Sequence, residues 1–397
     1  MIPISKAVKI IESKVVVLGT EKIGLETALG RVLAENIISD TDLPPFDRSQ
    51  MDGFAVIAKD TAKALVKLKI VGESSAGSGW HHRLKSGEAV RIMTGAPVPK
   101  GADAVQKVEL TEEKNDFVTV SEPTEKGRFI IRQGAEIKAG KSVLRAGERL
   151  TEANIAVPAA FGYAKVKVAK RPRVAIFSTG SEIVDIGKKP KKDQIRNSNS
   201  IMLKALAESS GAIATVLPNV GDKLSDLKSQ ISNAASTTDI LITTGGVSVG
   251  KYDFTKTALT ELGAEIFFDK IALKPGKPTV FAKLGKTFIF GLPGNPVSAA
   301  VTFHLFVREL MMLMQNASKT GLRQGFAVVG ERAKGTKDRD TYLPSKLDTD
   351  KTGRLIATPL KWHGSSDFIG FARAEALMIV PKGESREKDN VVEIVYL

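Results

Sequence analysis

Cysteine is absent from the 397-residue chain, which can therefore form neither disulfide bonds nor thiolate metal sites. No run of about 18 or more apolar residues is present, so we expect no membrane span. Residues 1–10 lack the apolar stretch and the small-residue cleavage site of a signal peptide. These absences together favour a cytoplasmic protein that does not bind a membrane.

Aromatic side chains are also scarce, whereas positive charge is in excess. The chain has 17 Phe, 4 Tyr and 2 Trp, and 58 basic against 44 acidic residues give a net charge of +14. Such an excess favours anionic partners, which include nucleic acids, phosphorylated metabolites and oxyanions, and it is equally explained by solubility. Because the lysines are spread along the chain without clustered aromatic residues, we do not expect a nucleic-acid groove.

The length suggests about two to four domains, and the sequence changes character twice. Residues 1–170 begin with predicted helices at 4–15 and 25–35. Short alternating stretches punctuated by Gly and Pro follow, and predict a β-rich domain inserted at about 45–140.

The second part, residues 171–318, alternates apolar strands with helices. The strands are expected at 174–178, 212–218 and 239–246, and a long helix closes the segment at 297–314. Apolar strands that alternate with helices are typical of a parallel sheet covered on both faces, so we predict a central α/β domain. Residues 319–397 return to short strands, expected at 326–332, 354–360, 376–381 and 391–397, and predict a small β-barrel-like domain. The fold class is thus multidomain α/β plus β.

Four loops of the central domain are rich in small residues or proline. They are STGSE (178–182), TTGGVSVGKYD (243–253), KIALKPGKP (270–278) and GLPGNP (291–296). Ligands of open parallel sheets bind outside the carboxyl ends of the strands, where three of these loops begin. A tight turn explains any one of them; the four together favour a binding site.

The residues of these loops suggest a phosphate or another anion as the ligand. The small residues let backbone N–H groups approach an anion closely, and the lysines add positive charge. Carboxylates beside phosphates commonly hold Mg²⁺. Asp222 is equally explained as the cap of a helix near 224. The residues concerned are Gly245, Gly246, Ser248 and Gly250; Lys270, Lys274 and Lys277; Glu182, Asp222 and Asp253; and Pro293 and Pro296, which precede a helix.

The amino-terminal part holds a second group of polar residues. PPFDRSQMDGFAV (44–56) contains Asp47, Arg48, Ser49 and Asp52, and RIMTGAPVPKGADAV (91–105) contains Thr94. An Asp-Gly turn with a proline-stiffened connection explains them as well as a site does. The pattern alone does not choose between these two explanations.

In this order, the quoted segments closely resemble the molybdopterin molybdenumtransferase family, which includes MoeA and the gephyrin E domain. The resemblance covers nearly the whole chain. It rests on FDRSQMDGFAV, RIMTGAPVPKGADAV, STGSE, TTGGVSVGKYD, LKPGKP and GLPGNPVSA. It implies an elongated four-domain chain that acts as a homodimer, with a central domain similar to molybdopterin adenylyltransferases. The active cleft would combine this domain with amino-terminal loops of the partner.

The implied reaction is the last step of molybdenum cofactor biosynthesis. Such enzymes take adenylylated molybdopterin and molybdate with Mg²⁺, and release the molybdenum cofactor and AMP. The adenylyltransferase and the molybdoenzyme apoproteins are further expected partners. By matching motifs the resemblance assigns catalytic positions to Asp52, Thr94, Glu182, Asp222, Lys270 and Lys274; metal binding to Asp253 and Glu182; and substrate binding to Gly245, Gly246, Ser248, Gly250, Lys277, Pro293, Pro296 and Ser365.

Two segments depart from the family pattern. IRQGAEI replaces an acid-rich RRGED, keeping Arg132 and Glu136, and Pro344 stands where an arginine is expected. Ser365 and Ser366 keep the serines expected to face the cleft. An adenylyltransferase would suit the central domain alone, and a gephyrin-like scaffold is the alternative from another class. The amino-terminal loop and the carboxyl-terminal domain favour molybdenum insertion.

Overall fold

The computed structural model describes residues 1–63, 65–246, 254–361 and 364–397, which fold into two compact units. The first unit consists of Met1–Glu35, Ala146–Thr151 and Lys165–Leu397, and the second of Asn36–Arg145 and Glu152–Ala164. The predicted domain boundaries near 170 and 318 both lie inside the first unit, so they stay a prediction about its internal division.

A six-stranded sheet forms the centre of the first unit. Its strand order is β16 (Ile213–Val216), β13 (Arg173–Ser178), β17 (Ile240–Thr244), β21 (Thr287–Leu292), β20 (Val280–Leu284) and β18 (Glu265–Phe268). The first four strands are mutually parallel, as predicted, whereas β20 runs antiparallel to both of its neighbours. The sheet is therefore mixed and not wholly parallel.

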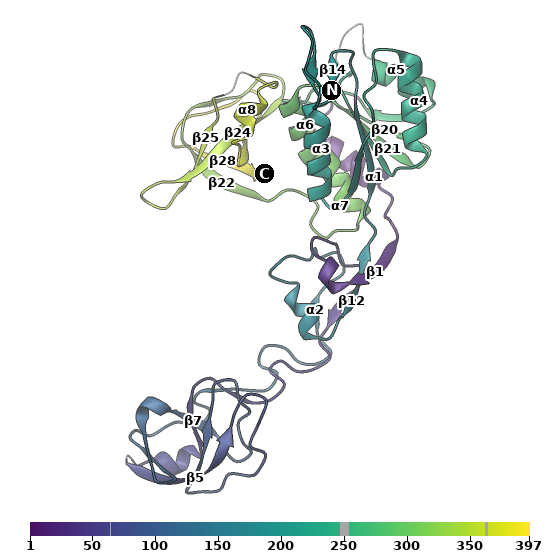
Figure 1. Ribbon diagram of the computed structural model, residues 1–397. Coiled ribbons are helices and arrows are strands. Elements are labelled where there is room, and N and C mark those ends of the chain that lie inside the picture. The colour runs from purple at the N-terminus through teal and green to yellow at the C-terminus, as the bar shows by residue number, and fades with distance from the viewer. Residues whose placement is uncertain (64, 247–253, 362–363) are drawn as a thin grey trace. The chain divides into compact units, whose positions relative to one another are not determined.

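Helices cover both faces of this sheet (Figure 1). Alternate side chains explain why, since Val174 and Ile176 pack on one face and Ala175 and Phe177 on the other. The first face is covered by α1 (Ile4–Lys14), α3 (Ser198–Ser209), α6 (Pro296–Thr302) and α7 (Arg308–Met314), and the second by α4 (Leu224–Ala235) and α5 (Phe254–Glu261).

The predicted long helix is present as one helical run, Pro296–Met314, in which a π-helical stretch at Phe303–Val307 joins α6 to α7. By length and composition alone this run could cross a membrane. It is 78% buried inside the fold, where Phe303, Phe306 and Leu310 are fully enclosed in the core. It is the core helix of this unit.

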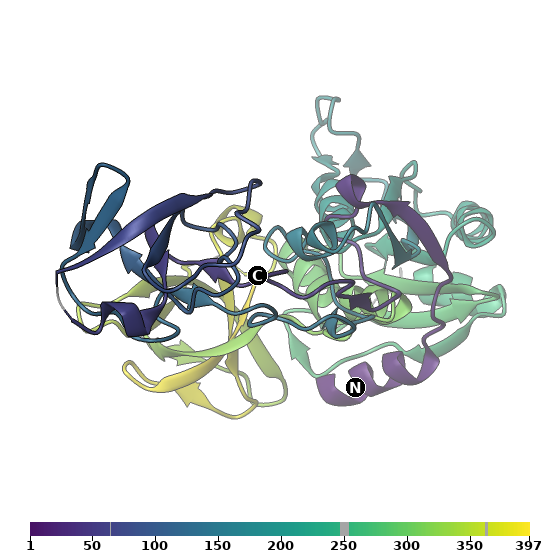
Figure 2. The same cartoon turned by 90° about the horizontal axis from the view of Figure 1, so that it is seen from below.

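The last strands of the chain close into a barrel. They are β22 (Gln324–Val329), β24 (Asp340–Thr349), β25 (Leu355–Pro359), β26 (Ala376–Val380) and β28 (Val391–Tyr396), and the pairing of β24 with β26 completes the ring. Figure 2 shows these strands, coloured green to yellow, curving around one another. The predicted β-barrel-like domain is confirmed, although β24 was not among the expected strands.

A strand of the barrel also pairs with the lysine-rich loop of the central domain, residues 270–278. Strand β19 (Leu273–Lys274) pairs in parallel with the start of β24, with Leu273 opposite Asp340 and Lys274 opposite Thr341. On the other side of this loop, Ile2 N–H donates to the Lys270 carbonyl at 3.0 Å. Two segments distant in sequence thus fix the backbone of the loop.

The helix predicted at 25–35 is wrong. Only the 3₁₀ turn Leu25–Thr27 forms, after β1 (Thr20–Gly24), which pairs with β12 (Lys165–Ala169). Gly30 adopts a φ of 76°, which breaks a helix. Beyond it Val32 and Leu33 are buried in extended bridges, so long-range pairing replaces the local helical preference.

The second unit is built on a six-stranded sheet, as the alternating sequence predicted. The order is β7 (Ala104–Lys107), β4 (Gly53–Val56), β6 (Glu88–Ile92), β5 (Val66–Ser74), β9 (Phe117–Val120) and β8 (Thr111–Lys114). Buried aliphatic and aromatic side chains, among them Phe54, Leu68 and Val118, form one core, and Val90 and Ile92 belong to another. In the same unit β3 (Arg48–Ser49) pairs with β10 (Ile130–Ile131) in a separate two-stranded sheet.

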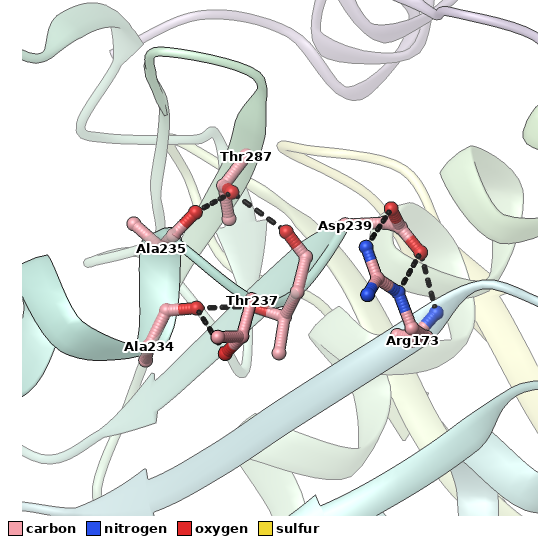
Figure 3. A network of polar contacts seen from close by, with 7 residues as sticks. Arg173, Ala234, Ala235, Thr237, Asp239 and Thr287 are labelled. Carbon is pink, nitrogen blue, oxygen red and sulfur yellow. Dashed lines mark hydrogen bonds and ion pairs between the residues drawn. The ribbon is translucent and has the colours of Figure 1, made fainter.

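Polar contacts join the amino-terminal ends of the central strands (Figure 3). Thr287 Oγ1 donates to the carbonyls of Ala235 and Thr238 at 2.6 and 2.7 Å, which ties β21 to the end of α4. Asp239 accepts from the Arg173 backbone at 2.8 Å and from its guanidinium at 3.3 Å. This network lies at the edge of the sheet opposite the loops discussed next.

Candidate functional site

The carboxyl ends of three central strands lie side by side. In the parallel register, Ser178 of β13 is opposite Thr244 of β17, and Thr244 is opposite Leu292 of β21. The loops that follow these residues are those in which the sequence predicted a site. The predicted juxtaposition of these three strand ends is confirmed.

The glycines of these loops allow the loops to pack on one another. A Cβ on Gly245, whose φ is 94°, would lie 2.6 Å from the Thr179 carbonyl oxygen. A Cβ on Gly246 would lie 2.9 Å from Thr179 Oγ1, and one on Gly294 would lie 3.5 Å from Gly245 Cα. Larger residues at 245 and 246 would push the loops apart. From the sequence, the close approach of an anion explains these glycines, and the packing of the loops on one another is a second reason for them.

A pocket of about 1020 Å³ opens at these strand ends. Its polar lining includes the carboxylates of Glu182 and Asp222, the backbone of Gly245 and Gly246, and the guanidinium-bearing Arg196. Pro293 and Pro296 line it as well. Six of the residues proposed from the sequence are thus brought to one hollow, which we call the nucleotide pocket.

Asp222 is held against the first of the three loops. Its Oδ2 accepts hydrogen bonds from Ser181 N–H at 3.1 Å and from Ser181 Oγ at 2.5 Å. Helix α4 starts at Leu224 after Lys223, with no side-chain cap. The explanation of Asp222 as a helix cap is therefore wrong, because its carboxylate bonds to a neighbouring loop across the pocket wall.

The start of α3 supplies pocket residues that the sequence reasoning missed. Asn197 caps this helix, accepting from Ser200 N–H at 3.1 Å and from Ser178 Oγ at 2.8 Å. Asn199 donates to Thr244 Oγ1 at 3.0 Å and to the Gly294 carbonyl at 2.7 Å. The signal was the segment RNSNS, in which asparagine and serine precede an apolar helix.

A second hollow of about 500 Å³ shares Pro278, Pro293 and Asn295 with the nucleotide pocket. Among the described residues that line it, three carry positive charge and none is acidic: Lys274, Lys277 and Arg339. Ser298 and Ser365 add hydroxyl groups. We call it the cationic hollow.

The carboxyl-terminal region reaches the cationic hollow through two segments. Ser365 Oγ accepts from Asn295 Nδ2 at 2.8 Å, and the Ser365 carbonyl accepts from Val297 N–H at 3.1 Å. Arg339 immediately precedes β24, whereas Pro344, at the position of the expected arginine, lies within β24 opposite Leu377. The sequence reasoning did not single out Arg339.

The remaining central candidates are placed differently. Lys270 is not among the lining residues of either hollow, although its carbonyl anchors the lysine-rich loop through Ile2. Its neighbour Asp269 has a lowered pKa, chiefly because Lys256 donates to it. Ser248, Gly250 and Asp253 lie outside the described residues.

The metal assignment rests on Asp253 and Glu182. Within the described parts of the chain, no group of three acidic or histidine side chains could hold a metal ion. Glu182 and Asp222 nevertheless both line the nucleotide pocket, and one or two carboxylates with several waters are a common Mg²⁺ environment. The donors fit the metal chemically, and magnesium binding stays a prediction.

Asp52 and Thr94, both in the second unit, are brought together. Asp52 Oδ1 accepts from Thr94 N–H at 2.7 Å and from Thr94 Oγ1 at 3.0 Å, and these bonds lower the pKa of the exposed Asp52 carboxyl. In the same unit Asp47 pairs with Arg132 at 2.5 Å, and Arg48 with Glu136 at 2.9 Å. The two predicted amino-terminal motifs therefore form one hydrogen-bonded loop cluster.

Family models match three consecutive parts of the chain. They are described as the MoeA N-terminal region (domain I and II) at residues 2–162, a probable molybdopterin binding domain at 175–312, and the MoeA C-terminal region (domain IV) at 327–397. A solved structure of a molybdopterin biosynthesis MoeA protein from Pyrococcus horikoshii OT3 superposes with a TM-score of 0.86 at 28% identity, covering 100% of both chains.

Curated relatives extend over nearly the whole chain. A molybdopterin molybdenumtransferase of Bacillus subtilis is 36% identical over 95% of this chain and 90% of its own length. One of Staphylococcus aureus is 34% identical over 96% of this chain and 92% of its own length. These relatives give no support to the adenylyltransferase and scaffold alternatives. The chain belongs to the molybdopterin molybdenumtransferase family, to which its MoeA-type domains also assign it.

Proposed function

We propose that this protein transfers molybdenum from molybdate into adenylylated molybdopterin and releases AMP, the last step of molybdenum cofactor biosynthesis. The observation that carries the proposal is the pair of adjoining hollows, which share Pro278, Pro293 and Asn295 and differ in charge. A reaction between a phosphate-bearing substrate and an oxyanion needs two neighbouring sites of this kind.

The cationic hollow suits molybdate. Lys274, Lys277 and Arg339 supply positive charge for a dianion, and Arg339 can donate two parallel N–H bonds to its oxygens. Ser365 accepts from Asn295 and still carries its own hydroxyl proton, which it can donate. The helical run Pro296–Met314 begins at this hollow, so its positive end favours an anion there.

The nucleotide pocket suits the adenylylated pterin. Gly246 and the start of α3 line it, and both are sources of N–H donors for phosphate oxygens, whereas Gly245 N–H donates to the Leu292 carbonyl at 3.2 Å. Asp222 is fixed by Ser181, so one carboxylate keeps a defined place on the pocket wall. Glu182 and Asp222 would hold Mg²⁺, together with Asp253 as the sequence predicts. When bound, the metal would stabilise the charge that develops as the phosphoanhydride bond breaks.

We further propose that the protein works as a cytoplasmic homodimer. The support is the family membership, together with the Asp52–Thr94 loop cluster, which matches motifs that complete the partner's cleft in the resemblance described above. The adenylyltransferase and molybdoenzyme apoproteins are its proposed partners. Light scattering of the purified chain would measure the mass in solution, and a monomer at working concentration would remove this part of the proposal.

The direct test mixes purified protein with adenylylated molybdopterin, Mg²⁺ and molybdate and measures AMP by chromatography. Release that requires molybdate is the expected result. Tight binding of the pterin nucleotide without release would mean a carrier function, and the proposed activity would then be withdrawn. Omitting Mg²⁺ in a parallel reaction tests the metal separately.

Two variants connect this activity to the cationic hollow. Lys274→Ala and Arg339→Ala should each raise the molybdate concentration needed for AMP release about tenfold or more, because each removes a charged hydrogen-bonding partner of the oxyanion. Lys286→Ala, an exposed lysine in the turn between β20 and β21, is the matched control for lost charge. An unchanged molybdate dependence in both variants would exclude this hollow as the molybdate site.

A further inference from the structure

Three exposed apolar side chains line the nucleotide pocket, and we call them the apolar rim. Ile186 is 56% exposed, Ile195 59% and Phe368 46%, and all three line the pocket. Single exposed apolar residues are common on protein surfaces and need no explanation. Here they come from two separate segments and line one pocket that also has polar lining residues. The segments are 183–196, in which β14 (Ile183–Val184) pairs with β15 (Ile195–Arg196), and helix α8 (Phe368–Phe371).

Backbone hydrogen bonds hold both segments in place. Ile195 N–H donates to the Glu182 carbonyl, and Asn197 N–H to the Val184 carbonyl, each at 2.9 Å. These bonds close the loop that carries Ile186 and Ile195. The segment that leads into α8 is tied to the central domain by the Ser365 carbonyl, which accepts from Val297 N–H at 3.1 Å, and Asp367 caps α8 by accepting from Gly370 N–H at 2.9 Å. The apolar rim is therefore built into the fold.

We infer that this rim binds the flat face of a bicyclic heteroaromatic ring, and that Phe368 stacks on it. The inference rests on the proposed function and names the part of the substrate that this end of the pocket recognises. A ring is the apolar part of a nucleotide-like ligand whose phosphate needs the N–H donors and charges of the polar lining residues. Burying the ring would also remove the three exposed side chains from water.

Two rings of the proposed substrate share this chemistry, the purine of the adenylate and the pterin. Branched side chains and one phenyl ring contact a π face without reading the edge of the ring, so both rings fit the rim equally by chemistry. The experiment must therefore contain one arm for each ring. A third arm, with a sugar phosphate that has no ring system, separates the rim from the polar lining residues.

The test compares three ligands by calorimetric titration: AMP, 6-(hydroxymethyl)pterin phosphate and ribose 5-phosphate. The variants are Phe368→Ser and the double variant Ile186→Ser/Ile195→Ser. In both, we expect the affinity for at least one ring-bearing ligand to fall about tenfold or more, since stacking on an aromatic side chain typically has that effect. The affinity for ribose 5-phosphate should stay unchanged. The ring-bearing ligand that loses affinity identifies the ring.

Controls keep a folding defect apart from a binding defect. Ile213→Ser removes an equally exposed isoleucine (52%) at an edge strand outside the pocket lining and should bind all three ligands as wild type does. Phe368→Leu keeps apolar area without a flat face, and should bind the ring with an affinity between those of wild type and Phe368→Ser. Thermal unfolding of each variant checks the fold.

Each contrary outcome has a distinct meaning. Unchanged affinities for both ring-bearing ligands in the rim variants, while wild type releases AMP in a molybdate-dependent reaction, would overturn the rim alone. An equal loss for ribose 5-phosphate would also overturn it, because the effect would then not depend on the ring. Failure of wild type to bind any of the three ligands would overturn the rim and the nucleotide pocket together.

Discussion

His304 gives the sharpest prediction about stability, because a mostly buried histidine titrates differently in the folded and the unfolded chain. It lies in the π-helical stretch of the core helix, against the Phe303 ring, and its Nδ1 is buried without a partner among the described residues. Burial, with a smaller contribution from the Arg308 guanidinium, lowers the pKa of His304 from 6.5 to about 4. At neutral pH the side chain is therefore neutral in the folded protein.

The sign of the effect follows from proton binding. Between about pH 6.5 and 4 the unfolded chain binds a proton at His304 and the folded chain does not, so acidification favours unfolding in this window. A pKa difference of 1 between the folded and the unfolded chain corresponds to about 1.4 kcal/mol of stability. The free energy of unfolding should therefore fall by about 2 kcal/mol at pH 5 and by about 3 kcal/mol below pH 4. Above pH 7 His304 is neutral in both the folded and the unfolded chain, so it no longer makes the stability depend on pH.

The assay is urea unfolding of wild type and His304→Leu, followed by circular dichroism at pH 7.5 and pH 5. Other acids and histidines titrate equally in both proteins, so the difference between the two isolates His304. We expect the free energy of unfolding of the variant to gain about 2 kcal/mol on wild type between the two pH values. His81→Gln, an exposed histidine of the second unit, is the control. A difference that does not change with pH would refute the argument that burial keeps His304 uncharged.

Two further predictions separate packing from chemistry. Gly245→Ala should weaken AMP binding and lower the unfolding temperature more than Gly263→Ala does. Both glycines have positive φ, but only a Cβ at 245 would meet a neighbour, the Thr179 carbonyl. Equal effects of the two variants in calorimetry would show that backbone strain alone is responsible. Thr287→Val should destabilise the protein by about 1 kcal/mol in urea unfolding, since two partly buried carbonyls lose a hydrogen-bond donor, while molybdate-dependent AMP release per folded molecule stays unchanged. A loss of activity would connect this edge of the sheet to the site.

Much of the fold could be predicted because local pattern and tertiary environment agree there. Strands β13 and β17 are continuous apolar runs that both faces of the sheet bury, and α3 and α4 follow a helical period. Residues 25–35 show the opposite case. Their composition favours a helix, and Gly30 together with the burial of Val32 and Leu33 in bridges to distant strands overrides it.

Some residues of the site could likewise be predicted from local sequence, and others could not. Residues within motifs at strand ends, such as Glu182 and Pro293, could be placed at one edge of the sheet because parallel strands end together. Arg339 could not, because it reaches the cationic hollow from the start of β24, and no local sequence pattern predicts that β19 pairs with β24. The place of Arg339 depends on a pairing between segments more than sixty residues apart. Phe368 could not either, because α8 is far in sequence from the other residues that line the nucleotide pocket.

The glycine-rich loop shows why a correct motif still leaves a physical reason open. Absent side chains at Gly245 and Gly246 were interpreted as room for an anion, and both residues do line the pocket. The same absence also lets Thr179 approach from the neighbouring loop. Loop packing and ligand access are therefore one requirement: the loops must touch for the pocket wall to exist, and they can touch only without Cβ atoms between them. A substitution there should remove the site by separating its walls before it blocks a ligand.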